Sequence, residues 1–282
     1  MGHKVAAIQM VSSSEVEDNL AAAGRLIASA AGQGAELVLL PEVFAVLEGG
    51  PMREYGEREG EGTIQRFLAA QAREHRIMLV GGTIPLITRP GRSDGDPDWL
   101  IEDGRVRPSC LVYDASGACI ARYDKIHLFD VEVEDRQASY SESRSYEPGA
   151  ELVTLPTPLG QLGLSVCYDL RFPELYRALF HRGAEIVTVP SAFTYVTGQA
   201  HWESLLRARA IENQCFIIAA GQGGRHNDRR ETWGHSMVID PWGRVLAEVK
   251  EAGEGVALAE IDPAQVAEVR RRMPIASQVR LQ

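Results

Sequence analysis

The stretch GAELVLLPEVF, Gly34–Phe44, has a counterpart in the second half of the chain, GAEIVTVPSAF, Gly183–Phe193. Each copy is an apolar run that a proline ends. Each also follows a stretch with a helical pattern, Leu20–Ala31 in the first half and Pro173–His181 in the second. Short apolar runs bounded by proline are typical of buried strands. The two copies therefore predict the same helix–strand unit twice.

The similarity continues beyond these stretches. Ile77–Gly82 (IMLVGG) corresponds to Phe216–Gly221 (FIIAAG), and both predict a second buried strand. Two hairpin candidates follow, LVYDASGACIARY from Leu111 and MVIDPWGRVLAEV from Met237. Both place Asp-x-x-Gly between alternating strands, which is a turn signal. Each half is thus expected to run helix–strand–helix–strand–hairpin.

Strands that are apolar on both faces, separated by amphipathic helices, predict layered α/β packing. Two similar halves stack most simply as two sheets face to face with helices outside. The predicted fold is a four-layer α-β-β-α sandwich with an internal pseudo-two-fold duplication, although chance similarity of two α/β units is the alternative. Residues 1–262 are assigned to this domain, and residues 263–282 to a C-terminal helix and tail that pack at a dimer interface.

Composition excludes several classes of function. The net charge of −10 over 282 residues argues against a surface that tracks nucleic-acid phosphates. No apolar run approaches the roughly 20 residues that span a bilayer, so a soluble protein without membrane partners is expected. The histidines lack paired metal-site spacing, and no phosphate-binding glycine loop occurs, so neither a metal nor a cofactor is expected. Four cysteines without a CxxC pair fit a reducing cytoplasm better than a disulfide framework.

One of those cysteines stands at a position that suits catalysis. Cys167 lies in GLSVCYDLRFPELY, Gly163–Tyr176, where a short apolar run ends and Pro173 opens a predicted helix. A sharp strand-to-helix turn lifts a side chain clear of the sheet, and serine hydrolases present their nucleophile in this way. The alternative is a small core residue. No histidine lies nearby in the sequence to act as its base.

Two charged residues occupy comparable positions. Glu42 follows the proline of LLPEVF and has apolar neighbours on both sides. Its carboxyl either begins a helix at the surface or lies in a semi-buried pocket, where a raised pKa suits a proton shuttle. Lys125, in RYDKIHLFD (Arg122–Asp130), is either a solvated strand-end charge or a cation directed at an oxyanion.

Taken together, the three motifs resemble those of the nitrilase superfamily of carbon–nitrogen hydrolases. The matching stretches are LLPEVF, YDKIHLFDVE and GLSVCYDLRFPELYR, in that order, with TGQAHWESLLRARAIEN and GHSMVIDPWG further on. The resemblance covers the chain from its first strand to about Pro274. It is greatest to the amidase branch that acts on omega-amides and deaminated glutathione, most of all in GGRHNDRRETWGHSMVIDPWG.

This resemblance implies a catalytic role for each residue. Glu42 would take the proton of Cys167, and Lys125 with the backbone N–H after Cys167 would stabilise the oxyanion. The amide would lose ammonia, leaving a thioester that water hydrolyses. Glu142, in SYSESRSYEPG, would orient Lys125 and the substrate amide. A thiolate at Cys167 should also react with iodoacetamide ahead of Cys110, Cys119 and Cys215.

A further group is assigned to substrate binding: Tyr168, Arg171, Arg225 and His226. Arg171 could face the site or form an ion pair with Asp169 or Glu174. The Arg225–His226 loop is the preferred determinant for the substrate, because an arginine fork suits a carboxylate. This loop lies in the segment that most resembles the amidases acting on deaminated glutathione, and the resemblance implies that deaminated glutathione is a better substrate than α-ketoglutaramate.

Other functions remain open at this point. An omega-amidase or an N-carbamoyl amino acid hydrolase would use the same residues, and a nitrilase-like scaffold would bind partners without turnover. A homodimer is expected through the helices Pro173–His181 and His201–Asn213, as in the family. The first of these helices carries four apolar residues that suggest surface left for a partner: Leu175, Tyr176, Leu179 and Phe180.

Overall fold

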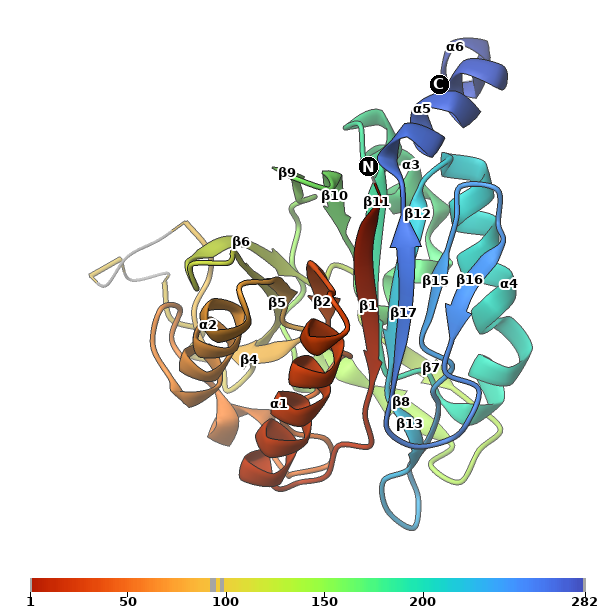
Figure 1. The fold of residues 1–282 in the computed structure, drawn as a ribbon. Coiled ribbons are helices and arrows are strands. Elements are labelled where there is room, and N and C mark those ends of the chain that lie inside the picture. Colours follow the sequence, from red (N-terminus) through yellow and green to blue (C-terminus); the bar gives the residue numbers. More distant parts are fainter. Residues whose placement is uncertain (1, 92–94, 97–98, 281–282) are drawn as a thin grey trace.

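The computed structural model describes residues 2–91, 95–96 and 99–280. Two β-sheets lie face to face, with helices on the outside of each (Figure 1). The helices α1 (Val16–Gly32) and α2 (Thr63–His75) cover one sheet, and α3 (Pro173–His181) and α4 (Tyr195–Asn213) cover the other. The predicted four-layer α-β-β-α sandwich is therefore confirmed.

The strand order of both sheets follows one scheme. The first sheet runs β17 (Gly255–Ile261), β1 (His3–Gln9), β2 (Leu37–Leu39), β3 (Met78–Val80), β5 (Arg107–Tyr113) and β4 (Ile84–Leu86), and β6 (Cys119–Asp124) also pairs with β5. The second sheet runs β16 (Val245–Glu248), β15 (Met237–Ile239), β12 (Phe216–Gly221), β11 (Ile186–Ser191), β10 (Gly160–Leu164) and β9 (Thr154–Thr157).

These orders make the two halves equivalent. The strands β1, β2 and β3 are parallel neighbours, as are β10, β11 and β12. In each sheet an antiparallel strand flanks this trio on either side, β17 and β5 in the first, β9 and β15 in the second. Both predicted hairpins form, as β5–β6 and β15–β16. The topology thus has the internal duplication that the repeated sequence predicts.

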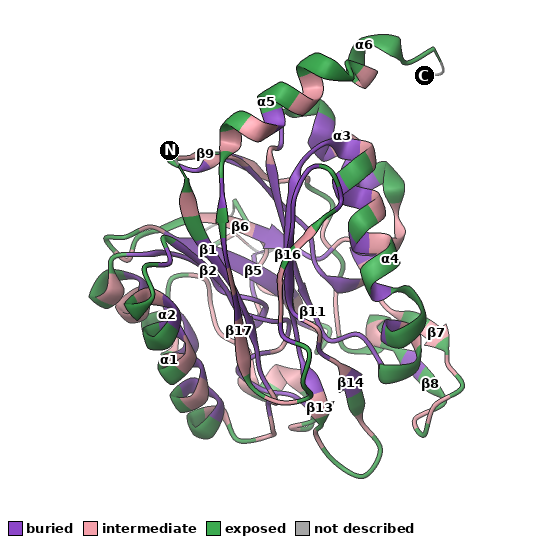
Figure 2. Ribbon diagram, turned by 45° about the vertical axis from the view of Figure 1, so that its right-hand side comes forward, coloured by how far each residue is buried: buried purple, intermediate pink, exposed green. Residues whose placement is uncertain are grey.

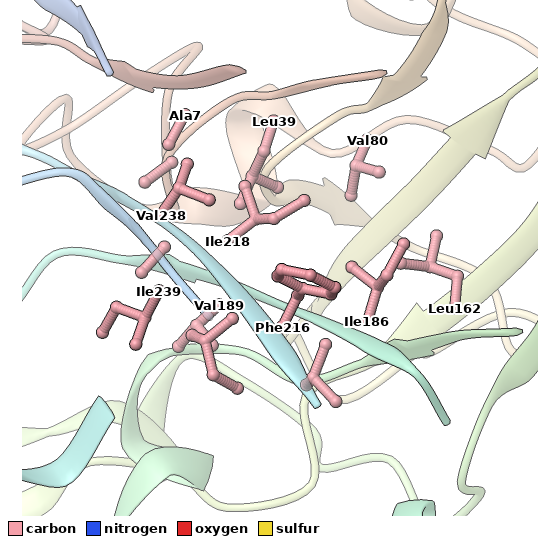
Figure 3. Packing of buried hydrophobic residues seen from close by; sticks show 14 of the residues in the cluster. Ala7, Leu39, Val80, Leu162, Ile186, Val189, Phe216, Ile218, Val238 and Ile239 are labelled. Carbon is pink, nitrogen blue, oxygen red and sulfur yellow. The ribbon is translucent and has the colours of Figure 1, made fainter. Parts of the chain in front are cut away.

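Alternation along the strands divides the core in two. On β1, Val5 and Ala7 point between the sheets, whereas Ala6 and Ile8 belong to a second cluster beneath α1 and α2. Figure 3 shows Ala7 and Leu39 of the first sheet packed against residues of the second, including Ile218 and Val238. Burying an aliphatic side chain of this kind contributes about 1.5–3 kcal/mol. Each central strand is apolar on both faces because both of its faces are covered by an apolar cluster.

The helices α1, α2, α3 and α4 each bury one face (Figure 2). On α1 the buried residues Leu20, Ala23, Ile27 and Ala30 recur every three or four positions, which places them along one stripe facing the sheet. Their outer faces are exposed. No helix in residues 2–91, 95–96 and 99–280 has the length and apolar character needed to cross a bilayer.

The shorter elements lie around this frame. They are the pairs β7 (Asp130–Glu132) with β8 (Ser139–Ser141) and β13 (Gly223–Arg225) with β14 (Glu231–Trp233), the 3-10 turns η1 (Met52–Tyr55), η2 (Glu142–Arg144) and η3 (Cys167–Arg171), and the helices α5 (Pro263–Arg272) and α6 (Ile275–Gln278). Helix α5 leaves the sandwich at one end (Figure 1). Residues 281–282 of the predicted tail lie outside the described part.

Three details differ from the sequence predictions. The apolar residues of α3 are all buried within the chain itself, at 0–6% exposure, so α3 has no apolar surplus for a partner. Proline ends β2 but not β11, which continues through Pro190 to Ser191. Helix α4 also begins earlier than His201, at Tyr195, where the Thr194 side chain accepts a hydrogen bond from the backbone N–H of Thr197.

Candidate active site

Glu42 lies just beyond the end of β2, where the chain leaves the sheet. Its carboxylate is 4% exposed, and Oε2 accepts a hydrogen bond of 2.9 Å from the backbone N–H of Ala192. The following residue, Val43, has φ +51°, a conformation that a β-branched residue rarely adopts. Backbone strain of this kind concentrates at functional sites. Glu42 is therefore held in a buried position between the two halves.

Lys125 follows β6 and is fully buried. Its Nζ lies 2.8 Å from Oε1 of Glu42, and 3.0 and 2.8 Å from the two carboxylate oxygens of Glu142. Burial alone would lower the pKa of Lys125, but the two carboxylates outweigh it and hold that pKa well above its usual value. The ammonium is thus a fixed positive charge.

Glu142 opens the turn η2 and is the second carboxylate bonded to Lys125. Its Oε2 also accepts a 2.8 Å hydrogen bond from the backbone N–H of Phe129. Burial raises the pKa of Glu142, and the negative charge of Glu42 adds to this, while Lys125 opposes it. These contacts fix the Glu142 carboxylate against the ammonium of Lys125.

Cys167 begins η3 with φ +45°, at a sharp turn three residues after β10 ends. Its side chain is 7% exposed. Burial raises the pKa of the thiol well above its usual value, and the charge and hydrogen bond of Glu42 raise it further, against the opposing charge of Lys125. The thiol of Cys167 therefore lies next to the carboxylate of Glu42, whose negative charge opposes loss of the thiol proton.

A second buried carboxylate, Asp169, joins the cysteine turn to the lysine segment. It accepts hydrogen bonds from the backbone N–H of Val166 at 2.8 Å and from the hydroxyl of Tyr123 at 2.6 Å. It also binds His127 through the backbone N–H, at 3.1 Å, and through Nδ1, at 2.7 Å. Tyr123 and His127 flank Lys125, so Asp169 positions the nucleophile relative to the ammonium.

The site opens into a cavity of about 480 Å³. Glu42, Glu142, Cys167 and Tyr168 all line it, so these four predicted residues lie together. Five aromatic residues contribute to its walls: Phe129, Tyr140, Tyr146, Tyr168 and Phe193. Among the residues that the structure describes, no group of three or more His, Cys, Asp or Glu side chains is arranged to hold a metal ion.

The other three predicted substrate contacts do not line this cavity. Arg171 packs its guanidinium 5.3 Å from the ring centre of Phe193, with Nη1 3.3 Å from Nδ1 of His201, instead of pairing with Asp169 or Glu174. The exposed Arg225 pairs with Asp228 at 2.7 Å.

His226 is held by local contacts as well. Its ring nitrogens bond to the carbonyl of Ser12, at 2.8 Å, and to the hydroxyl of Thr232, at 2.6 Å. Burial lowers its pKa to about 4, so the ring is neutral at pH 7. The positions of Arg225 and His226 therefore do not support the predicted carboxylate contact, because local partners already satisfy both side chains.

Arg230 is a cavity residue that sequence reasoning missed. It lies five residues beyond Arg225, just before β14, and lines the cavity with the catalytic candidates. The sequence offered only the adjacent pair Arg229–Arg230 in a loop, with nothing to show which of the two points inward. Nothing in the sequence marks Ala192 as the residue whose backbone N–H donates a hydrogen bond to Glu42 either.

The arrangement allows acyl transfer. A thiol, a carboxylate that can accept its proton, and a fixed cation lie at one end of a cavity large enough for a small molecule. The cation would stabilise an oxyanion formed beside the thiol. Such a set is suited to breaking the carbon–nitrogen bond of an amide.

Comparison with known proteins agrees with cleavage of carbon–nitrogen bonds. The model of the carbon-nitrogen hydrolase family matches residues 4–271. The deaminated glutathione amidase of Yersinia enterocolitica is 41% identical over 272 residues, which are 96% of this chain and 91% of the relative. The crystal structure of Saccharomyces cerevisiae Nit3, described as a member of branch 10 of the nitrilase superfamily, has a TM-score of 0.85 at 31% identity, covering 99% of this chain and 97% of that one.

A third solved structure concerns a reactive cysteine. It is a glutamate-to-glutamine variant of the Nesterenkonia amidase after Michael addition of acrylamide at its active-site cysteine. Its TM-score is 0.73 at 26% identity, with 96% of this chain and 99% of that chain covered. The present chain belongs to the carbon–nitrogen hydrolase family of the nitrilase superfamily and is an amidase, a hydrolase of carbon–nitrogen bonds other than peptide bonds.

Proposed function

We propose that this amidase works through a thioester on Cys167, with Glu42 as base and acid and Lys125 as the oxyanion cation. One observation carries the proposal: Nζ of Lys125 lies 2.8 Å from Glu42, whose carboxylate also interacts with the Cys167 thiol. A lysine and a glutamate buried together beside a thiol serve no packing need, because burying such charges costs free energy.

The steps follow from this geometry. Glu42 takes the thiol proton as Sγ attacks the amide carbon, and the carbonyl oxygen becomes an oxyanion facing Lys125 and the N–H of Tyr168. Glu42 then gives the proton to the amide nitrogen, the carbon–nitrogen bond breaks, and the thioester remains. Water attacks the thioester while Glu42 takes one of its protons. The acid leaves, and the proton returns to Sγ.

Deaminated glutathione is the proposed substrate. The naming of several relatives, at about 40% identity, supports it. In deaminated glutathione, as in glutathione, the amide bond to be cleaved joins the acyl group to the amine of the dipeptide cysteinylglycine. The leaving group from this substrate is therefore that amine and not ammonia. Ammonia leaves only from primary amides such as α-ketoglutaramate. This corrects the expectation that every turnover releases ammonia.

Three variants test the mechanism, with release of the acid product as the readout. Cys167→Ala should abolish turnover, whereas Cys119→Ala, at an exposed cysteine, should leave it unchanged. Glu42→Gln keeps the shape of the side chain and should cost about 10²–10⁴-fold, as loss of a general base does. Lys125→Met should cost a few kcal/mol, or roughly 10²–10³-fold. A Cys167→Ala protein that still turns over would rule out the thioester.

Assembly is also a proposal. We propose a homodimer that uses α4, which exposes apolar residues at both ends: Tyr195 at 40%, Val196 at 41% and Ile211 at 51%. Trp242, 54% exposed, lies in the turn next to Ile211, since the neighbouring Gly243 is against the Ile211 side chain. Exposed apolar groups of this kind are typical of protein–protein contacts.

A further inference from the structure

Arg230 reaches the active-site cavity from the β13–β14 hairpin. The hairpin is fixed against the end of β11, because the backbone N–H of Trp233 donates to the carbonyl of Phe193 at 3.0 Å and Thr232 bridges to Thr194. This docking directs Arg230 into the space that Glu42 and Cys167 also line. Among the described residues that line the cavity, Arg230 is the one basic side chain.

The guanidinium of Arg230 lacks a counter-ion. Nη2 donates to the carbonyl of Ala192 at 3.2 Å, and Cζ lies 4.8 Å from the ring centre of Tyr140. Nε is buried without a hydrogen-bond partner. In the described part of the chain no carboxylate forms an ion pair with it, whereas Lys125 has two. A buried, unpaired donor on a charged group is costly unless an anion satisfies it.

The guanidinium of Arg230 lies close enough to Glu42 to contact the far end of a small substrate whose amide is at Cys167. Ala192 uses its N–H to hold Glu42 and its C=O to hold Arg230. The guanidinium therefore lies within about 10 Å of the Glu42 carboxylate, since the N–H and C=O of one residue are only a few ångströms apart. A negatively charged group a few bonds from the scissile amide can reach it.

We infer that Arg230 binds a carboxylate of the substrate and makes the enzyme select amides that carry one. A planar guanidinium binds a carboxylate through two parallel hydrogen bonds, which gives both affinity and orientation. The inference rests on the proposed amidase mechanism and adds a specificity determinant to it. The carboxylate can belong to the acyl part or to the departing amine, and the experiment distinguishes the two.

The first arm removes the guanidinium. Wild type and Arg230→Gln are compared on glutaramate, the monoamide of a five-carbon dicarboxylic acid, and on pentanamide, its uncharged counterpart. If Arg230 binds a carboxylate on the acyl part, kcat/KM for glutaramate should fall roughly 10–100-fold, the value of a hydrogen bond to a charged group. For pentanamide it should be unchanged. Arg230→Lys, which keeps the charge but not the fork, should fall between wild type and Arg230→Gln on glutaramate.

The second arm locates the carboxylate. An uncharged pentanoyl group joined to cysteinylglycine carries its carboxylate only on the leaving amine. Loss of kcat/KM in Arg230→Gln with this amide but not with glutaramate assigns Arg230 to the amine side, and the reverse assigns it to the acyl side. Either result supports the inference.

Arg229→Gln is the matched control, because Arg229 is the adjacent arginine and is exposed. It should leave kcat/KM for all three amides at the wild-type value. Arg225→Gln tests the competing prediction for Arg225 in the same way. An equal loss on charged and uncharged amides in Arg230→Gln, or a loss in Arg225→Gln instead, overturns the inference. Neither result affects the thioester mechanism, which fails separately if Cys167→Ala remains active.

Discussion

At the scale of single residues, the surroundings of Cys167 bear on how it should react with alkylating reagents. Rapid alkylation of Cys167 was predicted because a reactive cysteine is usually a thiolate. The structure has a buried thiol whose pKa is raised by burial and by Glu42, while Cys119 is exposed. Cys119 is the one exposed cysteine of the four, so it has to be removed before the reaction of Cys167 with iodoacetamide is measured.

Removing the charge of Glu42 should lower the thiol pKa. In Glu42→Gln the negative charge and the hydrogen bond that raise it are gone, and the positive charge of Lys125 remains. We expect the midpoint of the pH–rate profile for iodoacetamide at Cys167 to shift to lower pH, measured in a Cys119→Ala background. Glu48→Gln, at an exposed carboxylate of the same cavity, should not shift it. A midpoint that stays in place or rises contradicts the pairing of Glu42 with Cys167.

At the scale of elements, one carboxylate connects the cysteine turn η3 to the segment that carries Lys125. Asp169 is fully buried and accepts bonds from the turn itself and from both neighbours of Lys125. The strand β10 ends before the turn, and β6 ends before Lys125, so neither strand holds the two side chains together. The side chain of Asp169 holds the cysteine turn and the lysine segment together instead.

Asp169→Asn should disrupt this connection while keeping the size of the side chain. One carboxylate oxygen becomes an N–H₂ group that faces donors, which costs about 1–3 kcal/mol for an unsatisfied buried group. We expect a lower melting temperature and a fall in kcat with KM little changed, because Asp169 does not line the cavity. Tyr123→Phe removes one of the same hydrogen bonds and should have the smaller effect on both. A variant that loses stability but keeps kcat shows a structural role only.

At the scale of the whole molecule, the candidate active site lies where the two halves meet. Glu42 comes from the end of β2 and Ala192 from the end of β11, the equivalent strand of the other half. The carboxyl ends of strands are where α/β sheets place their sites. Stacking the two sheets brings these ends together, and the same stacking leaves α4 on the outside (Figure 1).

Dimerisation through α4 can be tested directly. Ile211→Asp places a charge in the exposed apolar patch and should shift the protein from dimer to monomer in light scattering at micromolar concentration. Ile120→Asp changes an isoleucine of similar exposure, 42%, on β6 of the first sheet and should not alter the assembly. A wild-type protein that is monomeric contradicts the proposed dimer. A dimer that Ile120→Asp dissociates and Ile211→Asp does not contradicts the use of α4.

Much of the fold could be predicted from local sequence alone. The repeated runs at Gly34–Phe44 and Gly183–Phe193, the helix Pro173–His181 and the two Asp-x-x-Gly hairpins all appear in the structure. Each depends on periodicity and turn chemistry within a short window, which the sequence displays directly. The three catalytic candidates came from motifs, and the cavity brings Glu42 and Cys167 together, with Lys125 bonded to Glu42.

Only the tertiary structure decided which charged groups meet. Lys125 and Glu42 are 83 positions apart and Glu42 and Ala192 are 150 apart, and no local pattern encodes such pairings. The sequence favoured Arg225 for the substrate, yet the docking of one hairpin turns Arg225 outward and Arg230 inward. The apolar residues of α3 could face a partner or the core until the sheet beneath them was known. Hydrophobic patterns specify elements, whereas the neighbours of a side chain follow from how those elements stack.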